Sequence, residues 1–357
     1  MDPSTNQKLF AMLWLLSGAK KNVIGGFMAE TVNIGEIANT LSRDIFKHFL
    51  WKTHPKWDDN FKCNNPEHKS DGGTPKLTHP GDVVFFYEDP YLGKRIYLHT
   101  DLKSYSNSSI STPKVRDALR SLCMTVDCAT ASSDWRVKYS VDESERFEVR
   151  GMLFVHNHDN QYKKSFNDAL ARIDLSALPL PPQSIVHFLG PLDIQRLYNI
   201  ANDLIRLKGE GELPQEYTFF YPDLVISRRQ WDVWNQAATV ESLAGPYLII
   251  KHTGSESFEA GYVIYYNSPC ESVEEFEYFL DSLSRYQMLE SKAKIRIRVT
   301  ADILPEDLKS LFHSAKNRYS KAWGFDPTRA AILDRIHIDP LTAVTSTYTP
   351  GNMGWRE

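Results

Sequence analysis

The stretch HPGDVVFFYEDPYLGKRIYLHTDLKSY, His79–Tyr105, constrains the fold of this chain more than any other. Two runs rich in Val, Phe, Ile, Tyr and Leu, which are typical of strands, flank the turn-forming segment DPYLG. A turn centred near Tyr91 and Leu92 folds these runs into a hairpin and places Asp82 opposite Asp101. We therefore expect a β-sheet built around this hairpin.

Side chains of a strand alternate between the two faces of its sheet. Asp101 and Lys103 therefore share one face, and Asp82 joins them by cross-strand pairing if no bulge shifts the register. The opposite face receives large apolar side chains, which predicts that it is buried. These are Val83, Phe85, Ile96, Leu98 and Leu102.

Two carboxylates and a lysine at one strand end suit metal-dependent phosphodiester hydrolysis. Neighbouring carboxylates repel each other unless a cation joins them, and Mg²⁺ prefers hard oxygen ligands. A lysine beside them can hold the attacking water or stabilise charge developing at phosphorus. The alternative is a salt bridge between Lys103 and either aspartate at a solvated end of the sheet.

A third acid precedes the hairpin. Residues 25–50 are predicted to form a helix, because apolar side chains recur at helical spacing. Glu30 falls on that apolar stripe, where an unpaired carboxylate is costly unless it points toward a metal site or reaches solvent at the rim. A second Asp-Leu-Lys, Asp307–Lys309, is expected to be the first turn of an ordinary helix.

The order of these features resembles the PD-(D/E)XK nuclease superfamily over roughly residues 25–160. The resemblance implies a restriction-endonuclease-like mixed sheet flanked by helices. It also implies that Asp82, Asp101 and Glu30 hold Mg²⁺ (or Mn²⁺), and that Lys103 assists the attacking water. One departure is that Pro80-Gly81-Asp82 stands where the family usually has Pro-Asp.

The rest of the chain predicts a second α/β domain. The proline-rich segment 176–183 is the best candidate linker between an N-terminal domain, 1–175, and a C-terminal domain, 184–357. The latter contains a β-α-β pattern and is expected to serve targeting, assembly or regulation. Residues 52–80 are expected to be a loop, residues 111–129 a helix, and the end of the chain irregular.

Composition limits the classes of function. The net charge of −4 means that nucleic acid must be bound by a local basic surface. The predicted helix offers Lys114, Arg116 and Arg120, although these also suit a solvated helix face. No Walker A motif and no G-x-S-x-G motif occur, which disfavours a P-loop ATPase or an α/β-hydrolase.

Cysteine use and hydropathy predict a reduced, cytoplasmic protein. The four cysteines lack the spacing of a disulfide framework, and no apolar stretch is long enough for a membrane span. The short apolar run at residues 8–21 favours a helix with a core or dimer face over a signal peptide.

The sequence contains two further candidate metal sites and does not decide between metal binding and the alternatives. Cys63, His68 and His79 are three candidate zinc ligands in the polar loop, but the sequence offers no evident fourth. His156 and His158, with Asp159, could bind a transition metal, contact nucleic acid or simply end a strand.

The leading hypothesis is a Mg²⁺-dependent endonuclease that hydrolyses phosphodiester bonds of DNA or RNA, with DNA favoured. A two-domain nuclease of this type is similar to effectors of bacterial anti-phage defence, which implies a role with a second copy of the chain or a partner defence protein. The alternative is a non-catalytic nucleic-acid-binding or complex-assembly protein with a degenerate nuclease-like core.

Overall fold

The computed structural model describes residues 36–344, except 71, 143, 165, 183, 223–234, 255–258, 290–292, 302, 323 and 325. Glu30 and the apolar run at residues 8–21 therefore lie outside the described residues. The end of the helix predicted over 25–50 is confirmed, because residues 36–44 are helical and the 3-10 helix η1 (Phe46–Phe49) follows. None of the described helices combines the length and the apolar character that a membrane span needs.

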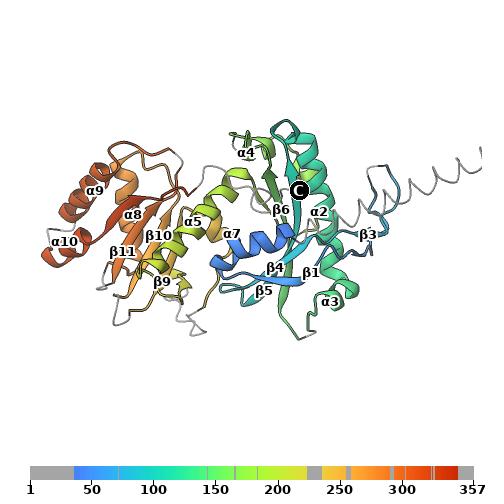
Figure 1. Ribbon diagram of the computed structural model, residues 1–357, viewed down its shortest axis with the longest axis horizontal. Coiled ribbons are helices and arrows are strands. Elements are labelled where there is room, and N and C mark those ends of the chain that lie inside the picture. The colour runs from blue at the N-terminus through green and yellow to red at the C-terminus, as the bar shows by residue number, and fades with distance from the viewer. Residues whose placement is uncertain are drawn as a thin grey trace, which may run out of the picture.

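The first sheet is mixed and has five strands in the order β1-β4-β5-β6-β7. They are β1 (Lys52–Trp57), β4 (Val83–Asp89), β5 (Lys94–Tyr105), β6 (Phe147–Asn157) and β7 (Val186–Leu189). The first three strands are antiparallel, whereas β5, β6 and β7 run parallel to one another. The predicted mixed sheet flanked by helices is confirmed (Figure 1).

Helix α2 (Thr112–Ala131) makes the crossover that two parallel strands require, from β5 to β6. Its apolar side chains recur every three or four residues, and Leu122 and Val126 pack with Leu153 of β6. The short helix α3 (Ser133–Lys138) continues along the same face, where Trp135 is completely buried. The shorter elements nearby are η2 (Asn107–Ser109), α4 (Phe166–Leu170) and η3 (Leu175–Ala177).

The second sheet has the order β12-β11-β10-β9-β8. Its strands are β8 (Thr218–Phe219), β9 (Tyr247–His252), β10 (Gly261–Tyr266), β11 (Lys294–Val299) and β12 (His337–Pro340). Its helices are α8 (Val273–Arg285), α9 (Leu308–Ala322) and α10 (Pro327–Asp334). Because β10 and β11 are parallel and α8 joins them, the predicted β-α-β unit is confirmed.

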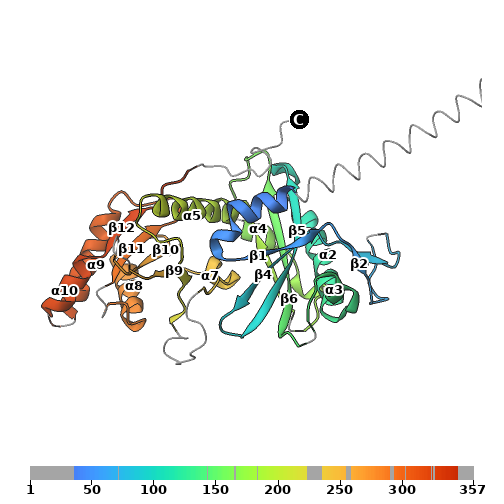
Figure 2. The ribbon, with the colours of Figure 1, turned by 60° about the horizontal axis from the view of Figure 1, so that its bottom comes forward.

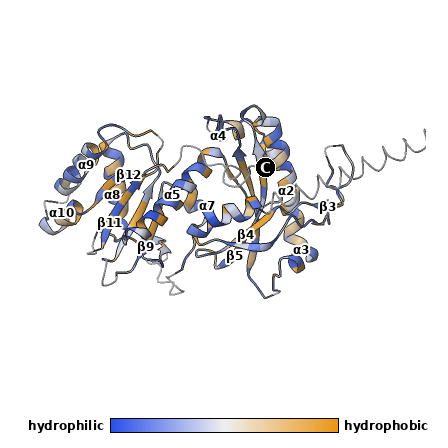
Figure 3. Ribbon diagram, viewed as in Figure 1, coloured by the Kyte–Doolittle hydropathy of each residue, from blue (hydrophilic) through white to orange (hydrophobic). Residues whose placement is uncertain are grey.

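Helices α5 (Pro191–Gly209) and α7 (Val240–Ala244) lie between the two sheets (Figure 2). One hydrophobic cluster contains residues of both sheets and of α5, among them Phe154 of β6 and Val263 of β10. Apolar residues follow the strands of both sheets (Figure 3). Buried hydrogen bonds also join the halves, since Trp51 Nε1 donates to the Ala238 carbonyl at 2.6 Å.

The division into domains at 176–183 stays a prediction. Strand β7 follows that segment in the sequence but pairs with β6, so the first sheet extends to Leu189. The shared hydrophobic cluster then continues through α5 into the second sheet. The proline-rich segment therefore lies within the chain that builds the first sheet.

Two expectations were wrong. Residues 52–80 are not a loop throughout, because they contain β1 and the small antiparallel pair β2 (Phe61–Lys62) and β3 (Thr78–His79). Pro55 made β1 hard to predict, but β1 is an edge strand with an irregular register, where a missing N–H is tolerated. The region after α9 is not wholly irregular either, since α10 and β12 add to the second sheet.

Candidate active site

The hairpin of β4 and β5 positions the predicted carboxylates. Its register runs from Val83 opposite Thr100 to Asp89 opposite Lys94, so Asp82 lies one step beyond, opposite Asp101, as predicted. Asp89 Oδ1 accepts hydrogen bonds from the backbone N–H groups of Tyr91 and Leu92, both at 2.9 Å, and so holds the turn. The turn is therefore located where the sequence predicted it.

Asp82 directly precedes β4 and its side chain is held in place. Its Oδ2 accepts a hydrogen bond of 2.9 Å from the backbone N–H of Leu102. Burial, together with the negative charge of Asp101, raises the pKa of Asp82 to about 7. Without a cation, Asp82 therefore holds its proton up to near-neutral pH, which is unusual for an aspartate.

Lys103 is paired with Asp101. The Lys103 Nζ lies 2.6 Å from Asp101 Oδ1, and the two side chains are 34% and 12% exposed. Burial alone would lower the pKa of Lys103, but the Asp101 and Asp82 carboxylates outweigh it and raise this pKa. The salt bridge considered from the sequence is thus present, with Asp101 as the partner, and it keeps Lys103 as an ammonium.

A cavity of about 10 Å³, lined by Asp82, Asp101 and His99 together with Ser121 and Thr125 of α2, adjoins the two carboxylates. This is about the space of one water-sized sphere. Oxygen atoms from two carboxylates beside so small a space suit a hard divalent cation. The geometry therefore fits the Mg²⁺ or Mn²⁺ that the resemblance implies.

His99 is a neighbour of the site that sequence reasoning missed. Its Nε2 donates to the Pro80 carbonyl at 2.8 Å, and its Nδ1 accepts from Trp135 Nε1 at 3.4 Å. Both contacts suit a neutral imidazole, and burial lowers the pKa of His99. Strand alternation could have identified it, because His99 is two residues before Asp101 and shares its face.

Gly81 explains the departure from the usual Pro-Asp pattern. A Cβ at this position would lie 2.8 Å from the Asp59 carbonyl oxygen and 2.9 Å from the Tyr139 hydroxyl. A side chain therefore has no room unless the backbone moves. The glycine therefore allows the backbone to pass close to Asp59 and Tyr139 just before Asp82 and the start of β4.

The three basic candidates lie on the exposed face of α2. Arg116 and Arg120 line a groove of about 700 Å³ with Lys69, but three acids line it too: Glu67, Asp127 and Asp174. The Lys114 ammonium lies over the Tyr105 ring, 5.7 Å from its centroid. Nucleic-acid binding by Lys114, Arg116 and Arg120 stays a prediction.

The remaining candidates from the sequence are His156, His158 and Asp159, at and just after the end of β6. His156 of β6 pairs with Ser104, and the Nδ1 atoms of His156 and His158 lie 3.4 and 3.3 Å from the Ser104 hydroxyl. Asp159 Oδ2 accepts from the backbone N–H of Asn107 at 2.8 Å, which gives this carboxylate a role in the loop. Both histidines therefore lie beside Ser104, whereas Lys103 pairs with Val155 of β6.

The second Asp-Leu-Lys is structural, as expected. Leu308 begins α9, and the exposed Lys309 pairs with Asp339 at 2.8 Å. Asp307 is exposed at the start of this helix. The tripeptide is therefore informative only where it lies in the hairpin strand.

Comparison with known proteins agrees with this geometry. Residues 28–192 match the family model of the GAPS4 protein PD-(D/E)XK nuclease domain. No curated protein and no solved structure matched the chain. The matched region contains the hairpin, α2 and β6, and it extends through β7. Residues 28–192 are therefore similar to the GAPS4 PD-(D/E)XK nuclease domain.

Proposed function

We propose that this protein is a divalent-metal-dependent endonuclease of anti-phage defence, in which Asp82, Asp101 and Lys103 form the active centre. The observation that carries the proposal is the hairpin register, which places Asp82 one step beyond Val83 and Thr100, opposite Asp101, together with the Lys103 ammonium 2.6 Å from Asp101 Oδ1. The family of residues 28–192 supports the nuclease activity, and its GAPS4 name supports the defence role.

The roles of the side chains follow from their contacts. Asp82 and Asp101 would hold Mg²⁺ or Mn²⁺, which supplies positive charge at the scissile phosphate and acidifies a water. The Leu102 N–H orients the Asp82 carboxylate toward that position. Asp101 orients the Lys103 ammonium, which donates a hydrogen bond to the attacking water or to a phosphate oxygen. Glu30 is proposed as a third acid on the evidence of the resemblance alone.

Substrate and partners belong to the same proposal. The substrate is DNA in preference to RNA, bound in part by Lys114, Arg116 and Arg120 through contacts to phosphates. The protein acts in the cytoplasm, with a second copy or a defence protein as its partner. Residues 184–357 are proposed as the targeting, assembly or regulatory domain, after the linker 176–183 and the nuclease domain 1–175.

Cleavage assays on the full chain test the proposal. Linear and supercoiled DNA and single- and double-stranded RNA are incubated with Mg²⁺, with Mn²⁺ and without added metal. We expect metal-dependent cleavage that Asp101→Ala abolishes, and the matched control Asp307→Ala, from the helical Asp-Leu-Lys, retains it. Binding of nucleic acid without cleavage under every condition would favour the alternative, a non-catalytic binding or assembly protein with a degenerate core.

A further inference from the structure

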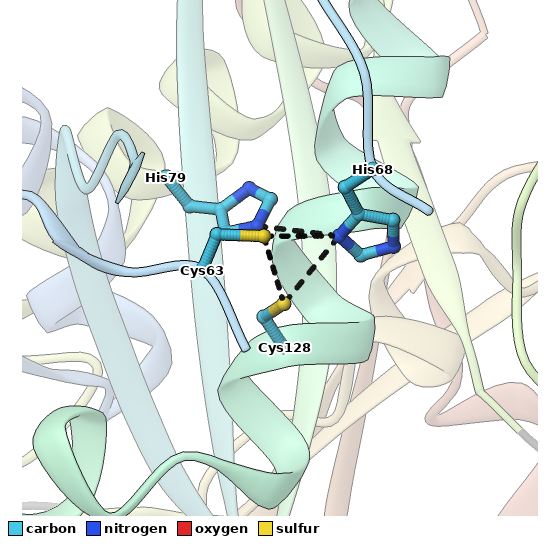
Figure 4. A group of neighbouring side chains, drawn as sticks. All are labelled: Cys63, His68, His79 and Cys128. Carbon is cyan, nitrogen blue, oxygen red and sulfur yellow. Dashed lines mark hydrogen bonds between the residues drawn. The ribbon is translucent and has the colours of Figure 1, made fainter. Parts of the chain in front are cut away.

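Four metal-ligating side chains from separate parts of the sequence meet beside α2 (Figure 4). Cys63 follows β2, His68 lies in the loop that comes next, His79 ends β3, and Cys128 belongs to α2. One ligand atom of each lies within 4.8 Å of the others. The first three are the candidate zinc ligands of the sequence, and the helix supplies the fourth.

Four of the six distances between the ligand atoms match the edges of a tetrahedron around zinc, and the other two are within 4.8 Å. The two Sγ atoms of Cys63 and Cys128 are 3.7 Å apart, and His68 Nδ1 is 3.6 and 3.4 Å from them. His68 Nδ1 and His79 Nε2 are 3.4 Å apart. Zinc bonds of about 2.3 Å to sulfur and about 2.05 Å to nitrogen predict edges of roughly 3.8, 3.5 and 3.3 Å.

The outer nitrogen atoms of both histidines are engaged in the way that metal-bound imidazoles usually are. His68 Nε2 lies 3.0 Å from Asp127 Oδ2, a carboxylate oxygen that also accepts from Asn65 Nδ2 at 2.9 Å. His79 Nδ1 lies 3.4 Å from the Thr125 hydroxyl, which itself donates to the Ser121 carbonyl. Such partners fix the tautomer and leave the other nitrogen as a ligand.

Cys128 Sγ has a contact that suits a metal-bound thiolate. The backbone N–H of Asn64 donates to Cys128 Sγ at 3.4 Å, a contact that stabilises a thiolate. The Sγ–Sγ distance of 3.7 Å is far longer than the roughly 2.05 Å of a disulfide. Cys128, His68 and His79 are buried, while Cys63 is partly exposed and gives the site a route to solvent.

We propose that Cys63, His68, His79 and Cys128 bind one structural zinc ion. Two sulfur and two nitrogen ligands in tetrahedral arrangement select zinc over hard cations such as Mg²⁺. Because the protein supplies all four ligands, no position is left for a substrate, which distinguishes a structural site from a catalytic one. This inference goes beyond the proposed nuclease function and does not depend on it.

The position of the ion gives it a role in the fold. It would fasten the polar segment 61–79, which is held by the two-residue pair of β2 and β3 and by the isolated bridge of Lys69 with Pro75, to the C-terminal end of α2. His79 is also three residues before Asp82, in the segment whose Pro80 carbonyl is held by His99. The zinc ion therefore stabilises the chain that leads into the candidate active centre.

Metal analysis of the full chain tests the site. Protein purified in reductant without chelator is measured by inductively coupled plasma mass spectrometry, and we expect one zinc per chain. Cys63→Ser, at the partly exposed ligand, should lose most of it. The matched control is Cys123→Ser. Cys123 is a buried cysteine of α2, the helix that carries Cys128, and it lies outside the cluster. Asp101→Ala should also keep its zinc, which separates this site from the candidate active centre.

Cobalt substitution of the wild type provides a readout that needs no variant to fold. Co²⁺ exchanged into the site should give the strong visible absorption of tetrahedral coordination and a thiolate-to-cobalt charge-transfer band. Wild-type protein that binds no zinc after reconstitution in reductant would overturn the proposal. So would zinc retained in full by Cys63→Ser, or an intact mass that shows a Cys63–Cys128 disulfide in the native protein.

Discussion

Replacing Asp82 with Asn should stabilise the protein above neutral pH in the absence of Mg²⁺ and Mn²⁺. The pKa of Asp82 rises from its ordinary value of 3.8 to about 7 in the folded protein, because of burial and the Asp101 charge. Between these two values the folded state holds a proton that the unfolded state has lost, so wild-type stability falls as pH rises through this window. Asn has no proton to lose.

The magnitude follows from the pKa. One pKa unit corresponds to about 1.4 kcal/mol, so ionised Asp82 lowers the free energy of unfolding by at most roughly 4 kcal/mol. Asn Oδ1 can still accept the hydrogen bond from the Leu102 N–H, and its Nδ2 can donate to Asp101. Because Asp82 and Asp101 share their charge, we expect about half of that limit, or ~2 kcal/mol, at pH 8. The difference between the variant and the wild type should shrink as the pH falls from 8 to 5, and it should vanish only below the ordinary value of 3.8, where Asp82 is protonated in both the folded and the unfolded state.

Thermal and denaturant unfolding at pH 5, 6, 7 and 8 measures this difference. Mg²⁺ and Mn²⁺ are removed by dialysis and added back, because EDTA would also strip the proposed zinc site. Millimolar Mn²⁺ should stabilise the wild type by mass action, and Asp82→Asn should respond less. Asp307→Asn, at an exposed position, is the control and should change neither the pH dependence nor the metal response.

Two results together would refute the reasoning. One is an Asp82→Asn variant that is less stable than the wild type at pH 8, which would mean that the Asp82 charge is favourable in the fold. The other is a wild type that added Mg²⁺ or Mn²⁺ does not stabilise. Asp82 would then be a structural acid, and the pairing with Asp101 would not be a metal site.

Other perturbations follow from the same structure. Lys103→Ala removes positive charge near the reacting phosphate, and Asp101→Ala removes a proposed metal ligand, so each should reduce cleavage at least about 10²-fold while circular dichroism stays unchanged. Full activity in either variant would exclude that residue. A chain that ends at residue 178 tests the domain division and should keep a folded core by circular dichroism. A chain that ends at residue 210 should resist proteolysis better than the chain that ends at 178, because β7 and α5 complete the first sheet and its hydrophobic cluster. Equal resistance of the two chains would show that these elements add no stability.

Much of the fold could be predicted because the signals are local. The hairpin register depends on one turn and on strand alternation, so Asp82 opposite Asp101 was predictable from residues 79–105 alone. Helix α2 was predictable from its apolar spacing and from Pro113 in the first turn. The strand β1 was not, because its polar sequence with Pro55 becomes a strand only by pairing with β4.

The match of residues 28–192 to the PD-(D/E)XK nuclease domain model comes from the sequence alone. The sequence by itself also determined which residues share a strand face and which helices are amphipathic. These properties depend on neighbours a few positions away. The tertiary structure decided that Lys103 pairs with Asp101 and that burial keeps Asp82 protonated. It also brought Cys128 to the three candidate ligands Cys63, His68 and His79, which are far from it in the sequence, because Thr125 of the crossover helix lies beside His79. Distances across a core arise only when the whole chain is folded, so no local pattern could show them.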